Sequence, residues 1–285
     1  MRWTGRRQSE NLEDRRGMGA GGKTAVGGIG GIVLVLVFAW LTGADPLQLL
    51  EQLGTQANVA PGSSTQVAAD DDVRRFVSTL LADTEDVWTD VFAQSSRRYT
   101  APRLVLYSGQ TQIPGGYANA ATGPFYLPND QTVYLDFSFF ETMRKRFGAG
   151  GDFAAAYVVA HEIGHHVQKL LGLTDWMQQQ RESVSEAQYN DLSVRLELQA
   201  DFLAGMWAHH AQKRWNILEP GDVDEVFGAA SAVGDDRMQK ATRGRVVPDS
   251  FTHGTAEQRS RWFKKGFESG RMSEGNTFQL ARDQL

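Results

Sequence analysis

The sequence predicts a mainly helical α+β domain with a small β-sheet, preceded by one transmembrane helix. Three patterns support this prediction: an uncharged apolar stretch at residues 25–41, two short extended runs at residues 103–107 and 132–139, and helical periodicity over most of the chain after residue 152. The chain has 285 residues, of which 41% are hydrophobic and 22% are charged, so it can bury one substantial core.

The N-terminal region carries the membrane signal. Residues 25–41 (AVGGIGGIVLVLVFAWL) hold no charge and come close to the length that a helix needs to cross about 30 Å of hydrocarbon. Residues 1–24 hold six basic and three acidic residues. The positive-inside rule therefore predicts a basic cytoplasmic leader at 1–24, a transmembrane anchor at 25–44 and an extracytoplasmic remainder, as in a single-pass protein of the cell membrane. A cleaved secretory signal is the alternative, since small residues follow the apolar stretch.

Residues 45–69 are rich in Gln, Ala, Gly and Ser, a composition that predicts a linker. The folded domain is expected to cover residues 70–285. Its first helix should begin near Asp70 and pack in the core, because apolar residues recur there at helical spacing. These residues are Val73, Phe76, Val77, Leu80, Leu81, Trp88 and Val91.

Two strands should form the small sheet, at residues 103–107 and 132–139. In the second run, Val133, Leu135 and Phe137 alternate with polar residues, as is typical of a strand. We hypothesise that this segment is a sheet edge along which a peptide substrate lies as an added strand. Residues 113–130 between them are rich in Gly and Pro and predict an irregular loop. The later helices are expected near 152–171, 185–215, 221–233 and 255–269.

Composition limits the chemistry that the domain can perform. The chain has no cysteine, so any metal must be held by imidazole and carboxylate groups. After the basic leader the chain is acidic, and no basic cluster is present that could neutralise phosphates. The sequence therefore argues against a nucleic-acid partner.

The segment AHEIGHH holds His161, Glu162 and His165 in the H-E-x-x-H arrangement, within a predicted helix. Residues four apart share one helix face, so both imidazoles can bind one ion while Glu162 reaches its water. His166 is rotated by about 100° from His165 and should not be a ligand. The alternative is a helix whose histidines are simply buried in the core.

A catalytic zinc ion usually has three protein ligands, so a third ligand is required. Glu197 and Asp201 lie four apart on a largely apolar helix, where two carboxylates are costly to bury without a cation. We expect Glu197 to be the third ligand and Asp201 to accept a hydrogen bond from a ligand histidine. A solvated charged face is the alternative interpretation.

Histidines outside the motif have weaker signals. His253 precedes a helix start and could hydrogen-bond a developing oxyanion, or it could serve only in capping or packing. Arg259 follows on that helix and could pair with Asp201. His209 and His210 end the preceding long helix, where the helix dipole favours them without a metal.

Five segments together resemble the bacterial neutral zinc metallopeptidases, a YpfJ-like family of membrane-anchored zincins, from about residue 123 to the end. They are GPFYLPNDQTVYLDFSFF, AHEIGHHVQKLLG, LSVRLELQAD, GDDRMQ and GRVVPDSFTHGTAEQR. The resemblance implies a zincin-like peptidase domain with His161, His165 and Glu197 as metal ligands and Glu162 as base. Similarity to related membrane-associated zinc peptidases implies that His253 assists the transition state and that Arg259 braces Asp201.

The sequence thus predicts a zinc-dependent endopeptidase that binds one Zn²⁺ per chain, acts on a peptide or protein substrate, and is attached to the membrane by its N-terminal helix. Glu162 would act as general base on a metal-activated water. The alternative function is a zinc-stabilised, catalytically inactive, membrane-anchored binding or regulatory module. The sequence makes no prediction about oligomeric state.

Overall fold

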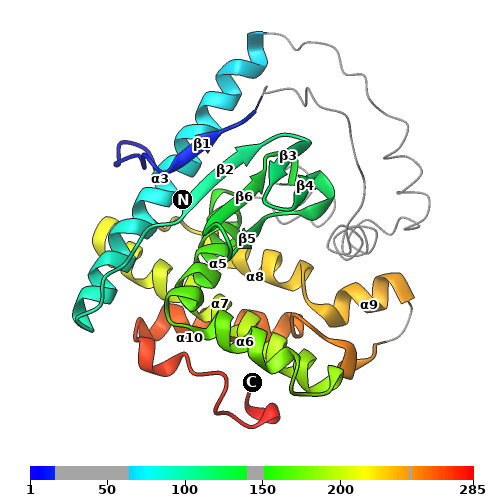
Figure 1. The fold of residues 1–285 in the computed structure, drawn as a ribbon. Helices are drawn as coiled ribbons and strands as arrows, with labels where there is room; N and C mark the ends of the chain where they lie inside the picture. The colour runs from blue at the N-terminus through cyan, green and yellow to red at the C-terminus, as the bar shows by residue number, and fades with distance from the viewer. Residues whose placement is uncertain (17–63, 140–150, 244–245) are drawn as a thin grey trace, which may run out of the picture.

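The computed structural model describes residues 1–16, 64–139, 151–243 and 246–285 (Figure 1). The helices are α3 (Ser64–Gln94), α5 (Asp152–Leu170), α6 (Leu173–Arg181), α7 (Glu186–Trp215), α8 (Asp222–Ala232), α9 (Asp235–Arg243) and α10 (Ala256–Ser269). The strands are β1 (Leu12–Asp14), β2 (Arg103–Tyr107), β3 (Gln110–Ile113), β4 (Gly116–Asn119), β5 (Phe125–Leu127) and β6 (Thr132–Asp136). The predicted mainly helical α+β class with a small sheet is confirmed.

The main sheet has the strand order β1-β2-β6-β5. The first three strands run parallel, and β5 pairs with β6 in the antiparallel sense at one edge. Strands β3 and β4 form a separate hairpin. A turn at Pro114 and Gly115 closes this hairpin, where Gly115 has a φ of 87°, a conformation that glycine adopts at little cost.

Both faces of the main sheet are covered. Side chains from one face, including Leu104, Leu106, Val133 and Leu135, join the large core that the helices form. On the other face, a second apolar cluster contains Val105, Tyr107 and Tyr134 together with Ala118 of β4. Strand β6 is consequently buried along its whole length.

Two sequence predictions about this region are wrong. Strand β6 is central, so the predicted edge at residues 132–139 is not an edge. Of the polar members of the alternating pattern, Tyr134 joins the second cluster, and Thr132 and Asp136 are buried. Residues 113–130, predicted to be irregular, contain β4 and β5. Strands of three or four residues leave too short a pattern to recognise, and the Gly and Pro residues serve the hairpin turn.

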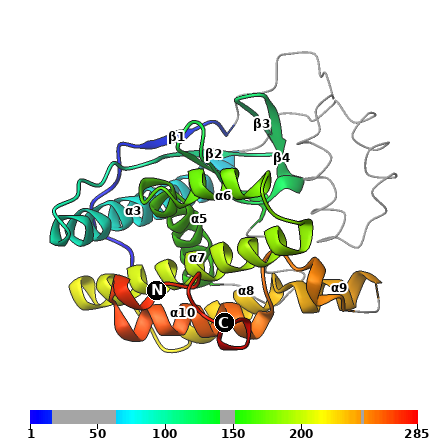
Figure 2. The ribbon, with the colours of Figure 1, turned by 60° about the horizontal axis from the view of Figure 1, so that its bottom comes forward.

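Helices α7 and α10 lie side by side (Figure 2). A Cβ atom on Gly205 of α7 would lie 2.0 Å from the carbonyl oxygen of Phe263, and one on Gly266 of α10 would lie 2.0 Å from that of Phe202. Only glycine at both positions allows the two backbones to approach so closely. This packing fixes the position of α10 relative to the inner face of α7.

The N-terminal segment, residues 1–16, packs on the domain (Figure 1). Strand β1 pairs with β2, the backbone N–H of Ser9 donates to the carbonyl of Ser78 over 3.0 Å, and the N–H of Arg2 donates to that of Ile217 over 2.8 Å. The described part of the predicted leader therefore belongs to the folded unit. A membrane separating the leader from the domain would require β1 to leave β2.

No helix in the described ranges is long and apolar enough to cross a membrane. The predicted span at 25–44 lies outside the described residues, as does most of the predicted linker. Helix α3 begins at Ser64 rather than near Asp70, so the end of the predicted linker is helical.

Glu85 of α3 is the main polar anchor of the N-terminal segment. Its buried carboxylate accepts hydrogen bonds from Arg7, Ser9 and Asn11. We expect Glu85→Ala to lower the free energy of unfolding by about 1–3 kcal/mol, because three donors lose their acceptor. Urea denaturation of the full chain measures this change.

Glu13→Ala is the matched control, because its carboxylate pairs with Arg15 at the surface within the same segment. Its effect should stay within about 0.5 kcal/mol. Equal stability of the Glu85→Ala and Glu13→Ala variants would contradict the assignment of Glu85 as the anchor.

Candidate metal centre

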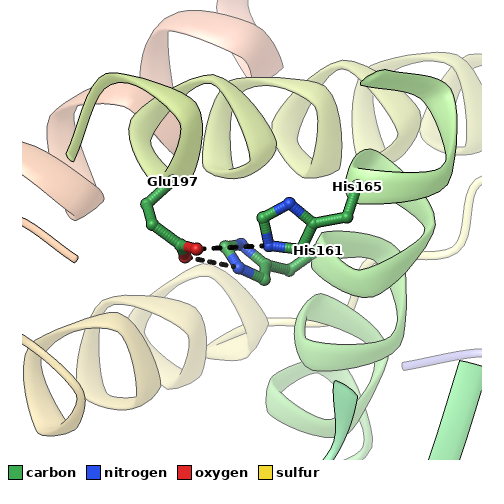
Figure 3. A group of neighbouring side chains, drawn as sticks. All are labelled: His161, His165 and Glu197. Atoms are coloured by element: carbon green, nitrogen blue, oxygen red, sulfur yellow. Dashed lines mark hydrogen bonds and ion pairs between the residues drawn. The ribbon is translucent and has the colours of Figure 1, made fainter. Parts of the chain in front are cut away.

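Two helices bring the three predicted ligands together (Figure 3). His161 and His165 project from the same face of α5, with their ring centroids 4.8 Å apart. Nε2 of His161 lies 3.2 Å from Oε2 of Glu197 on α7, and Nε2 of His165 lies 3.4 Å from Oε1. Both imidazoles thus point the same ring nitrogen at one carboxylate.

The motif itself permits this approach. A Cβ atom on Gly164, between the two histidines, would lie 3.0 Å from the carbonyl oxygen of Ala200 on α7. The helices therefore cross in close contact at this point, which places Glu197, one turn before Ala200, opposite the histidines.

The donor set fits a zinc ion. One donor atom from each of His161, His165 and Glu197 lies within 4.8 Å of the other two. A tetrahedral zinc ion with bonds of about 2.1 Å holds its ligand atoms about 3.4 Å apart, close to the separations of 3.2 and 3.4 Å between imidazole and carboxylate. Two imidazoles and one carboxylate leave a fourth position for water, as catalytic zinc sites require.

Asp201 is fully buried behind His161. Its Oδ1 atom lies 2.8 Å from Nδ1 of His161 and accepts a hydrogen bond of 2.6 Å from the Tyr157 hydroxyl. Arg259 of α10 donates to both carboxylate oxygens, over 2.8 and 3.0 Å. Burial alone would raise the pKa of Asp201, but Arg259 and His161 outweigh it and lower the pKa below its usual value. The structure thus places Asp201 and Arg259 together, with Asp201 against the first histidine.

The second histidine has a neutral partner that sequence reasoning missed. Nδ1 of His165 lies 2.9 Å from Oε1 of Gln168, which is fully buried. The Gln168 amide donates in turn to the carbonyl of Leu196 over 2.7 Å. Since an amide oxygen can only accept, Nδ1 of His165 carries the hydrogen and Nε2 is free to bind a metal.

Glu162 is buried next to the two histidines, with 9% of its surface exposed. Burial raises the pKa of its carboxyl, while the charges of His165 and His161 and a hydrogen bond from the backbone of Tyr126 in β5 oppose that rise. The result is a carboxylate of increased basicity next to the group that could hold a metal.

His253 lies in the loop before α10, and its side chain is partly exposed. Nδ1 lies 3.3 Å from Oδ1 of Asp235 and 3.0 Å from the Thr252 hydroxyl. Burial opposes the charge of this histidine, but Asp235 and Glu197 together raise its pKa. The ring is therefore within electrostatic reach of Glu197 without touching it.

Three other histidines lie outside the candidate centre. His166 is buried, accepts a hydrogen bond from Tyr126 at Nδ1, and donates from Nε2 to the Thr100 carbonyl. His209 and His210 bond the carbonyls of Phe267 and Gly270 at the end of α10. These three histidines join elements of the fold rather than the candidate centre.

Zinc binding should release a proton. In the zinc-free protein, burial opposes the charge of His161, but Asp201 and Glu197 raise its pKa to about 10. At neutral pH this histidine is protonated, so zinc must displace the proton, and zinc affinity should rise by about tenfold per pH unit.

Calorimetric titration of zinc in buffers of different ionisation enthalpy measures the release, expected to be about one proton per zinc. His210→Gln, far from the centre, is the control and should leave this number unchanged. Zinc uptake without proton release would contradict the described environment of His161.

Comparison with known proteins agrees with this geometry. The chain matches the family described as "Putative neutral zinc metallopeptidase" over residues 1–278. It is 46% identical over 288 residues to "Uncharacterized protein YpfJ" of Escherichia coli (strain K12), covering 98% of this chain and 99% of that relative. It is 41% identical over 256 residues to "Uncharacterized protein Rv2575" of Mycobacterium tuberculosis (strain ATCC 25618 / H37Rv), covering 85% and 86%.

No solved structure shows significant similarity to the chain. The family match extends beyond the segments that carried the resemblance, since it also includes the N-terminal segment that packs on the domain. The family resemblance stated from the sequence is confirmed, and this chain belongs to the family described as "Putative neutral zinc metallopeptidase".

Proposed function

We propose that this chain is a zinc-dependent endopeptidase that hydrolyses peptide bonds of peptide or protein substrates. The observation that carries the proposal is the convergence of Nε2 of His161 and of His165 on the Glu197 carboxylate, with Glu162 beside them. These three side chains would hold one zinc ion per chain. Zinc in such a site polarises a carbonyl and activates water.

The protein's own groups would move the proton. The raised pKa of Glu162 brings its basicity closer to neutral pH, where a general base is most effective. Glu162 takes a proton from the attacking water and passes it to the leaving amine. His253 hydrogen-bonds the developing oxyanion, and Arg259 holds Asp201, which in turn orients His161.

The substrate would lie along β5. In the described sheet, β5 pairs with β6 on one side and has no strand on its other side. The backbone of Tyr126 in β5 also forms a hydrogen bond with the Glu162 carboxylate. An extended peptide added to that edge would bring its backbone next to the general base. We therefore propose β5, in place of residues 132–139, as the sheet edge that accepts the peptide.

We also propose attachment to a membrane through residues 25–44 that does not pass to the other side, in place of the single span expected from the sequence, with residues 1–16 and the peptidase domain on the same side. The pairing of β1 with β2 supports this sidedness.

The chain has no cysteine, so Glu10→Cys and Glu268→Cys, both at exposed positions, each introduce one thiol. A membrane-impermeant maleimide applied to intact cells should label both variants or neither. Labelling of one variant alone would overturn the sidedness.

Glu162→Gln tests the enzymatic reaction. The amide cannot accept the proton, so cleavage of a peptide library should fall by at least about 100-fold. Zinc content, measured on the purified full chain, should stay at one ion per chain, because Glu162 is outside the ligand set. Glu257→Gln at the exposed start of α10 is the matched control and should keep full activity.

Two results would count against the enzyme. A Glu162→Gln variant that cleaves as well as the unmodified chain would remove Glu162 from the mechanism. An unmodified, zinc-loaded chain that cleaves nothing in the library would favour the zinc-stabilised binding or regulatory module.

A further inference from the structure

Two acidic residues at the start of α9, Asp235 and Asp236, lie outside the group formed by His161, His165 and Glu197. They belong to the GDDRMQ segment, and Asp235 is buried. The preceding residue, Gly234, is pressed against the start of α10, because a Cβ atom there would lie 2.3 Å from the backbone nitrogen of Ala256. The start of α9 is thus held against the loop that carries His253.

Asp235 holds this loop by its backbone. Oδ2 of Asp235 accepts hydrogen bonds from the N–H groups of Thr252, His253 and Gly254, over 2.8, 2.6 and 3.0 Å. The N–H of Asp235 donates back to the carbonyl of Gly254 over 2.9 Å. Three converging donors on one oxygen leave the carboxylate little freedom to rotate.

The other oxygen of the same carboxylate faces the imidazole. Oδ1 of Asp235 lies 3.3 Å from Nδ1 of His253. Nε2, the opposite ring nitrogen, has no hydrogen-bond partner among the described residues. One buried carboxylate therefore fixes both the backbone of the loop and the orientation of the ring.

Asp236 has a different task. Its Oδ1 accepts a hydrogen bond of 2.8 Å from the N–H of Ala256, at the first turn of α10. In the described part of the chain, no hydrogen bond or ion pair joins Asp236 to His253. The carboxylate of Asp235 thus binds the loop, and the carboxylate of Asp236 binds the start of α10.

We propose that Asp235 is a positioning residue for His253: it accepts the Nδ1 hydrogen and directs Nε2 toward the reacting carbonyl. The inference rests on the proposed endopeptidase function. A carboxylate behind an imidazole fixes its orientation and favours the protonated ring, so that Nε2–H becomes a charge-assisted donor to an oxyanion. The raised pKa of His253 agrees with this arrangement.

Thr252 offers a competing arrangement. Its hydroxyl lies 3.0 Å from Nδ1 and could donate to that nitrogen if it carried no hydrogen. Asp235 would then hold only the backbone of the loop. The two arrangements differ in whether Nδ1 of His253 carries a hydrogen.

Asp235→Asn separates the two tasks of Asp235. The amide oxygen can still accept the three backbone N–H groups, whereas the amide nitrogen that replaces Oδ1 cannot accept from Nδ1. In the zinc-loaded full chain we expect kcat to fall by about tenfold or more, with KM, zinc content and thermal midpoint little changed. Asp236→Asn is the matched control and should keep the kcat of the unmodified chain.

A double variant shows whether Asp235 acts through His253. His253→Ala should lower kcat at least as much as Asp235→Asn, and adding Asp235→Asn to His253→Ala should cause no further loss. A kcat in Asp235→Asn equal to that of the unmodified chain would overturn the proposal. So would a full additional loss in the double variant.

Nitrogen-15 NMR of labelled histidines provides a measurement independent of activity. In the unmodified zinc-loaded chain with the ring protonated, both Nδ1 and Nε2 of His253 should carry a hydrogen, and Asp235→Asn should favour the neutral ring without the hydrogen on Nδ1. An Nδ1 without hydrogen in the unmodified chain would overturn the proposal in favour of the Thr252 arrangement. This result stands even if the chain cleaves no peptide, so the failure of the endopeptidase function and the failure of the positioning role are distinguishable.

Discussion

The geometry of the candidate centre depends on one buried charge, the carboxylate of Asp201. An ionised carboxylate without solvent contact is costly unless hydrogen bonds and an opposite charge compensate it. Here the compensation comes from Tyr157 and His161 on α5 and from Arg259 on α10. Three helices far apart in sequence are therefore joined at a single side chain. The first histidine of the motif owes its orientation to this junction.

The two motif histidines are oriented by different means. His161 faces a carboxylate whose charge is shared with an arginine, whereas His165 faces the neutral amide of Gln168. Both arrangements leave Nε2 directed at Glu197. The difference limits the negative charge behind the two histidines to one compensated carboxylate, so Glu197 would be the main negative ligand of a bound cation.

The sequence predicted the parts of this site that local spacing determines. The H-E-x-x-H helix, the pairing of Glu197 with Asp201 on one helix face, and strand β2 all follow from periodicity within a few residues. Gln168 and Asp235 could not be found in this way, because each acts through a partner that only the fold brings near. The GDDRMQ segment contributed to the family resemblance, but its local pattern predicted no role for its aspartates. Nothing in that pattern indicated that Asp235 would bind the backbone of a loop 17 to 19 residues later. The arginines of the leader gave a membrane-topology signal, and their spacing did not show that two of them, Arg6 and Arg7, pair with Asp83 and Glu85 of α3.

The position of β1 in the sheet affects how this protein can be handled. In the described sheet β1 occupies the outer side of β2, so it covers backbone N–H and C=O groups of a strand that is otherwise apolar. A fragment that starts at α3, which would exclude the apolar residues 25–41, lacks β1. The backbone N–H and C=O groups of β2 are then exposed and can pair with strands of other molecules. Self-association of such a fragment would then reflect the missing strand rather than a natural oligomer, because β1 is the element that covers this side of β2 in the described sheet.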